Sequence, residues 1–159
     1  MSYTTVSNVS GMFPTFVRGA ATQKPADTLI QTYIDDVAGD LDAILRKRFG
    51  EIIAESYAGS FTAFAAGFST DALNVLEKIN RYGAAAQLAG TLATFGVTSA
   101  ERLGKDFDEE FEELRNRLEA VDARGKFLTS GLYDHLFDSL AAIQSPRPGL
   151  SGIAGGDMP

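Results

Sequence analysis

The stretch PADTLIQTYIDDVAGDLDAILRKRFG, residues 25–50, decides the fold. Its apolar side chains recur every three or four residues, which is the spacing of one face of an α-helix. They are Leu29, Ile30, Tyr33, Ile34, Val37, Leu41, Ile44, Leu45 and Phe49. Pro25 and Asp27 suit a first helical turn, because proline there loses no hydrogen bond and a negative charge complements the helix dipole. The basic run at 46–48 suits the last turn, and Gly50 follows as a stop. The sequence predicts a long amphipathic helix here.

A second long helix is predicted over residues 69–96. Ser69, Thr70 and Asp71 are alternative N-caps, since their side-chain oxygens accept hydrogen bonds from free backbone N–H groups. Apolar residues then continue at helical spacing up to Gly96: Leu73, Leu76, Ile79, Tyr82, Ala86, Ala89 or Gly90, Ala93 and Phe95. The latter half, GAAAQLAGTLATFG, is rich in small residues, which let another backbone approach closely. We therefore expect this helix to be the most buried and to pack centrally.

A third helix is predicted from Thr98 or Ser99 to Gly125, and it has a narrow apolar seam. The seam residues recur at intervals of 4, 4, 3, 4 and 3: Leu103, Phe107, Phe111, Leu114, Leu118 and Val121. Most other positions are charged, so this helix is expected at the surface, facing solvent or a neighbouring subunit. Its run DFDEEFEE, residues 106–113, holds six carboxylates. Such runs are usually solvated helix faces.

The remaining segments are shorter. Val6, Val9 and Phe13, after Thr4 or Thr5, predict one or two helical turns before Pro14. Residues 51–68 are apolar but contain glycines at 59 and 67, which predicts broken helix or loop. A short helical segment is predicted from Leu132, Tyr133, Leu136, Phe137 and Leu140.

The predicted fold class is all-α, a helical bundle. It has three long helices, short N-terminal and C-terminal helical segments and an extended C-terminal tail. The last 15 residues hold three of the five prolines, so residues 144–159 are predicted to be a flexible tail. Residues 1–143 are predicted to form one helical domain.

Composition excludes several classes of function. The chain has 159 residues and a net charge of -7, which argues against a nucleic-acid binder because that binding depends on Lys and Arg. The few basic residues, the 46–48 run among them, are more typical of solubility and ion pairing than of a nucleic-acid patch. There is no cysteine, and no run of about 20 apolar residues suggests a membrane span. We expect a soluble, cytosolic protein.

The acidic residues offer two weak chemical hypotheses. Asp108 and Glu112 lie one helical turn apart and could bridge a divalent ion, but such sites usually need ligands from several elements. Asp36 and Asp40 share a helix face, yet nothing predicts the burial that would separate their pKa values for acid and base catalysis. His135, the single histidine, has no nucleophile near it in sequence. We expect no catalytic residue, metal or cofactor.

The chain resembles the phage head–tail connector, or adaptor, family over residues 3–125. Three features carry the resemblance: the opening Tyr3-Thr4-Thr5-Val6 followed by Val9 and Phe13, the helix Leu29 to Phe49 with Tyr33-Ile34-Asp35-Asp36 and Leu41-Asp42-Ala43-Ile44-Leu45, and the alanine-rich helix after it. The resemblance implies a non-catalytic helical bundle that forms a ring, commonly twelvefold, on the portal after DNA packaging. It places the protein in the neck of a virion, made in host cytoplasm, where DNA passes onward to a stopper or tail protein.

Two surfaces are implied to serve assembly. In such adaptors an arm or tail commonly reaches the portal, and here the candidates are Pro146, Arg147, Pro148, Leu150 and Ile153. The candidates for a ring contact or a lumen face are Asp106, Asp108, Glu109, Glu112 and Glu113, because an acidic lumen repels DNA. The apolar 51–68 segment is a further candidate for ring contacts. No sequence-specific DNA binding and no membrane contact are expected.

Two alternatives remain open. One is a non-viral helical binding module that acts as a monomer, or as a dimer through the Leu103 to Val121 seam. The other is a metal-dependent enzyme that uses the Asp and Glu clusters. A seam dimer predicts that Phe107→Glu dissolves an assembly without unfolding the domain. The enzyme hypothesis predicts that Mn²⁺ or Mg²⁺ raises the melting temperature of the protein, since a bound ligand stabilises the folded state.

Overall fold

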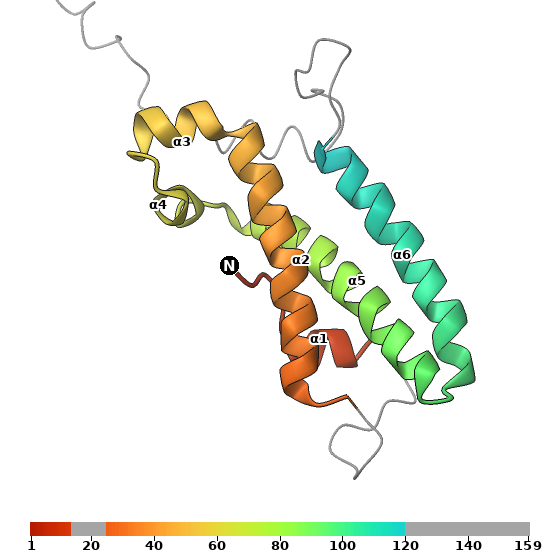
Figure 1. The fold of residues 1–159 in the computed structure, drawn as a ribbon. Coiled ribbons are helices and arrows are strands. Elements are labelled where there is room, and N and C mark those ends of the chain that lie inside the picture. The colour runs from red at the N-terminus through yellow and green to blue at the C-terminus, as the bar shows by residue number, and fades with distance from the viewer. Residues whose placement is uncertain (14–24, 120–159) are drawn as a thin grey trace, which may run out of the picture.

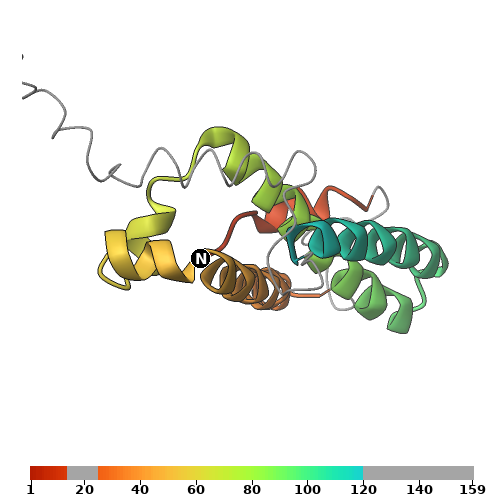
Figure 2. The same cartoon turned by 90° about the horizontal axis from the view of Figure 1, so that it is seen from above.

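A computed structural model describes residues 1–13 and 25–119, which form helices and no strand. Three helices are long: α2 (Asp27–Arg48), α5 (Thr70–Thr94) and α6 (Thr98–Glu119). Three are short: α1 (Val6–Ser10), α3 (Gly50–Ser56) and α4 (Phe61–Ala65). Helices α5 and α6 form an antiparallel hairpin and α2 packs across α5, while α3 and α4 lie on the side of α2 away from α6 (Figures 1 and 2). The described part of the chain is all-α, as predicted.

Local capping explains where several helices begin and end. The Thr5 hydroxyl accepts from the Asn8 N–H at the start of α1, and the Ser69 hydroxyl accepts from the Ala72 N–H at the start of α5. After α5 the chain reverses at Gly96, whose φ of +82° is a conformation that only glycine adopts without strain. The predicted short N-terminal helix and the predicted limits of α5 are confirmed.

The prediction that Gly50 stops the first long helix is half right. Helix α2 ends at Arg48, but Gly50 opens α3 instead of a loop. The bend lies at Phe49, whose side chain is buried and whose ring packs 5.4 Å from that of Phe64. Burial of this ring turns the chain, and Gly50 adopts helical geometry straight afterwards.

The 51–68 segment is not a free apolar surface, and this expectation is corrected. It forms α3 and α4, with a break at Ala58 and Gly59, both of which have positive φ. All three of its phenylalanines are buried in the core together with one isoleucine and one alanine: Phe61, Phe64, Phe68, Ile53 and Ala65. Phe64 is fully buried, with neighbouring rings at centroid distances of 5.2 to 6.0 Å. These aromatic side chains pack against one another inside the domain, so they are not available for a contact between subunits of a ring-shaped assembly.

Helix α5 occupies the central position, as predicted, but with a different buried face. It contacts α1, α2 and α6, and its core residues include Leu76, Ile79 and Leu88, which are fully buried. Leu73 and Phe95, which were expected in the core, are 37% and 50% exposed. Because α5 packs on several neighbours, its small residues are buried on two sides and a single apolar stripe does not describe it.

The seam of α6 packs inside the chain. Leu114 and Leu118 are buried, and the ring of Phe107 lies 5.5 Å from that of Phe13 and 5.9 Å from that of Tyr82. The seam therefore belongs to the core of this domain and is not a free surface for a partner. Val121 and the predicted end at Gly125 lie outside the described residues.

Candidate interaction surfaces

The acidic candidates on α6 are solvent-exposed, and Asp108 among them borders α5. Asp106, Asp108, Glu109, Glu112 and Glu113 are all exposed. Three of them pair with cations of the same helix: Lys105 with Glu109 at 3.8 Å, Arg115 with Glu112 at 3.7 Å, and Arg117 with Glu113. Exposed pairs of this kind contribute about 0.2–1 kcal/mol at most.

Asp106 and Asp108 have no ion-pair partner within ranges 1–13 and 25–119. The outer side of α6 is thus a solvated surface that retains negative charge. Within the same ranges, no three His, Asp or Glu side chains converge as a metal site would require. Within these ranges, Asp108 and Glu112 therefore have no third metal ligand from another helix.

The carboxylates of α2 fasten the N-terminal segment. Asp35 accepts from the Ser2 hydroxyl at 2.6 Å and from the Gln31 amide at 2.8 Å, and these hydrogen bonds hold its pKa below the ordinary range. Asp42 accepts from the Tyr3 hydroxyl, and burial together with this bond raises the pKa of Tyr3. Asp36 and Asp40, the pair considered for catalysis, are exposed on the outer side of α2.

A partly buried polar junction joins the N-terminal segment, α2 and α5. We call it the N-terminal junction and define it by Tyr3, Thr4, Asp42, Glu77 and Asn80. The Asn80 amide is fully buried, donates to the Ile34 carbonyl at 2.9 Å and accepts from the Tyr3 N–H at 3.2 Å. The Thr4 hydroxyl donates to Glu77 at 2.9 Å. The junction holds three separate stretches of sequence together.

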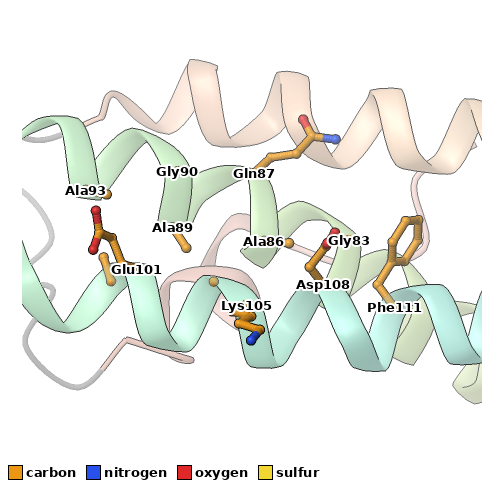
Figure 3. A pocket seen from close by; sticks show the side chains of 12 residues that line it. Gly83, Ala86, Gln87, Ala89, Gly90, Ala93, Glu101, Lys105, Asp108 and Phe111 are labelled. Carbon is orange, nitrogen blue, oxygen red and sulfur yellow. The ribbon is translucent and has the colours of Figure 1, made fainter.

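A groove of about 520 Å³ runs between α5 and α6 (Figure 3). Small residues from both helices line most of it: Gly83, Ala86, Ala89, Gly90, Ala93, Ala100 and Gly104. Glu101, Lys105 and Asp108 of α6 border it, with Phe111 at one end (Figure 3). The alanine-rich composition predicted a close approach of helices, but the groove itself was not predicted.

The glycines of this hairpin differ in what surrounds them. A Cβ on Gly104 would lie 2.8 Å from the Cβ of Ala89, and a Cβ on Gly83 would lie 2.8 Å from the Phe111 ring. Both glycines are therefore needed for the close contact of α5 with its neighbours. A Cβ on Gly90 would meet nothing within 4 Å.

The basic run that ends α2 serves the fold. The Arg46 guanidinium lies 4.3 Å from the centroid of the Phe61 ring, a cation–π contact. The Arg48 side chain donates to the Leu118 carbonyl at 3.0 Å and so ties α2 to the last turn of α6. Lys47 is exposed. Two of the three cations thus make tertiary contacts that the sequence did not predict.

His135 and the portal candidates Pro146, Arg147, Pro148, Leu150 and Ile153 lie outside the described residues, as does the predicted helical segment at 132–140. The chain matches no protein-family model, no curated protein and no solved structure. Among the described helices, none is both long and apolar enough to span a membrane.

Proposed function

We propose that this protein is a phage head–tail connector adaptor. It forms a ring on the portal, links the DNA-filled head to the stopper or tail, and gives DNA a passage. It acts through assembly, without catalysis or a cofactor, in the neck of the virion after synthesis in the host cytoplasm. The three long helices make the domain of the subunit.

The observation that carries the proposal is the N-terminal junction. The resemblance to adaptors depends on the opening Tyr3-Thr4-Thr5-Val6, on two stretches of α2, and on the alanine-rich helix after it. Tyr3 bonds to Asp42 of α2 and to Asn80 of α5, and Asn80 bonds to the Ile34 carbonyl of α2. Stretches far apart in sequence thus meet at one partly buried site. The residues that carry the resemblance therefore include side chains that hold the subunit together, which supports the proposal.

The outer side of α6 suits a ring that surrounds DNA. Its exposed carboxylates keep negative charge outward, and such charge repels phosphates over roughly 8–10 Å at physiological ionic strength. Facing the lumen, this side would let DNA slide without binding. Facing a neighbour, it would need cations from that subunit, since heterologous ring contacts join two different patches.

Charge reversal separates these two roles. The double variant Asp106→Lys and Glu109→Lys leaves the domain folded because both side chains are exposed. If the face is a subunit contact, the ring seen by electron microscopy is lost. If the face lines the lumen, the ring persists and gains affinity for DNA that falls with added salt. The matched control is Glu51→Lys on α3, which is also exposed.

The tail is proposed to contact the portal. The candidates combine two prolines with two apolar anchors, a composition typical of segments that dock as extended peptides: Pro146, Arg147, Pro148, Leu150 and Ile153. The test is size-exclusion chromatography with light scattering of the full chain mixed with the portal of its virion. Leu150→Ser with Ile153→Ser should abolish co-elution, whereas the control Ser151→Ala should not. Co-elution that survives the double change contradicts the tail contact.

The same light-scattering run tests the remaining alternative. A binding module that acts as monomer or dimer predicts one stable small species with and without portal. A portal-dependent shift to a large complex excludes it. No observation in the described residues favours the module, since the seam that would have served it is packed inside the domain.

A further inference from the structure

Gly90 has no role in the packing that the structure describes. A glycine inside a helix costs about 0.5–1 kcal/mol relative to alanine, and Gly90 lies well inside α5. Gly83 and Gly104 have a steric reason, because an added Cβ would collide with Phe111 or Ala89. At Gly90 the space is open, on the groove between α5 and α6. Because Gly90 has no side chain, a second segment that lies in this groove can approach the backbone of α5 closely.

The shape of the groove suits a short helix. On α5 it runs from Gly83 to Ala93, about 15 Å at 1.5 Å per residue. Glycine and alanine form most of its floor, as at close helix–helix contacts, and its borders are polar (Figure 3). A helix of two to three turns with one apolar side would fill it.

The chain itself carries a segment with these properties. Leu132, Tyr133, Leu136, Phe137 and Leu140 would share one side of a helix, and Asp134, His135, Asp138 and Ser139 would share the other. Residues 132–140 would measure about 13 Å as a helix, close to the length of the groove. A helix this short is not stable alone in water, so it requires an apolar surface.

The connection between α6 and residues 132–140 is long enough for this segment to reach the groove. Helix α6 ends at Glu119, and the groove extends back along α6 to Ala100, a helical distance of about 28 Å. Residues 120–131 can span about 40 Å when extended. The segment can therefore turn back and reach every part of the groove without strain.

We propose that residues 132–140 bind as a short helix in the α5–α6 groove of the same chain, with their apolar side against Gly90. The link to α6 keeps the segment at high local concentration, so binding within one chain prevails over binding between chains. Residues 144–159 then depart from the α5–α6 hairpin, which sets where the tail is presented. The inference stands independently of the adaptor function.

Disulfide trapping tests the proposal, because the natural chain has no cysteine. Gly90→Cys is combined in the full chain with Leu136→Cys or, in a second variant, with Leu140→Cys, and each is oxidised at low protein concentration. The control combines Gly39→Cys with Leu136→Cys, since Gly39 is exposed on the outer side of α2. The proposal expects an intramolecular disulfide in at least one Gly90 pair and none in the control. Disulfide-linked dimers would show that a second copy fills the groove, and no disulfide in either pair would show that the segment does not; both results overturn the proposal.

A thermal measurement gives an independent answer. Gly90→Leu and Gly39→Leu both replace a helix-interior glycine around which a Cβ would meet nothing within 4 Å. In an empty groove both changes raise the melting temperature by about 2–4 °C, from the gain in helix propensity. The proposal expects Gly39→Leu to raise it and Gly90→Leu to lower it, because the leucine displaces the segment. A rise of equal size in both variants overturns it.

Discussion

The contact between Gly104 and Ala89 allows a prediction with a definite sign. Replacement of Gly104 by alanine would place two Cβ atoms 2.8 Å apart on facing helices, where carbon atoms prefer about 3.5–4.0 Å. Both atoms are attached directly to helical backbone, so neither can rotate away. Helices α5 and α6 would have to separate along their contact, which is the largest in the fold.

Two opposing contributions set the magnitude. Gly→Ala inside a helix contributes about 1 kcal/mol of stability through propensity. Overpacking of a close contact costs about 1–3 kcal/mol. The difference is a net loss of up to about 2 kcal/mol in the free energy of unfolding, equivalent to a fall of up to roughly 8 °C in melting temperature.

Urea unfolding followed by circular dichroism at 222 nm measures this change. The exchange variant Gly104→Ala with Ala89→Gly removes the overlap and keeps one glycine and one alanine, so it should return to within about 0.5 kcal/mol of wild type. Gly39→Ala, at an exposed helical position with open space, is the control and should stabilise by about 0.5–1 kcal/mol. If Gly104→Ala stabilises the protein as much as this control does, the close approach of α5 and α6 is refuted.

Three further predictions concern the core and the N-terminal segment. Asn80→Ala removes two hydrogen bonds at a fully buried site and should cost about 2–4 kcal/mol in urea unfolding; a loss below about 1 kcal/mol would show that the N-terminal junction is not formed. Leu114→Glu places a charge in the core and should abolish the cooperative unfolding transition, while Phe107→Glu, at a half-buried site against the core, should destabilise the domain; a monomer as stable as wild type in either case would restore the seam as a docking surface. The Ser2 and Gln31 hydrogen bonds lower the pKa of Asp35 in the folded state, so its contribution to stability is present above the unfolded value and is lost as pH falls below about 4. Asp35→Asn should accordingly show less loss of stability between pH 5 and pH 3, by well under about 1 kcal/mol because the group is exposed; an equal loss in both proteins would contradict the assignment.

The long helices were predictable because their signals are local. The limits of α5 follow from Ser69 and Gly96, whose capping and turn chemistry needs no knowledge of the rest of the chain. The seam of α6 follows from its spacing alone. The spacing does not indicate the packing partner of the seam. That α5 of the same chain is the partner depends on the tertiary arrangement.

The errors also have physical causes. Gly50 was expected to stop a helix, yet burial of the Phe49 ring bends the chain and α3 begins at once. Phe95 follows the last residue of α5 as its C-cap and is half exposed, so helical spacing no longer fixes the direction of its side chain. Asn80 gave no signal, since a buried amide needs partners from Tyr3 and Ile34, which are distant in sequence. The groove at Gly90 arises from two helices jointly and is visible only in the assembled hairpin.

Electron microscopy of the full chain mixed with the portal of its virion tests the central claim most directly. The account predicts closed rings of this protein seated on one end of the portal, with a continuous central passage. In such an image the orientation of α6 would identify the surface that faces DNA. A portal that remains bare at saturating protein concentration, while light scattering shows only monomers or dimers, would contradict the adaptor function.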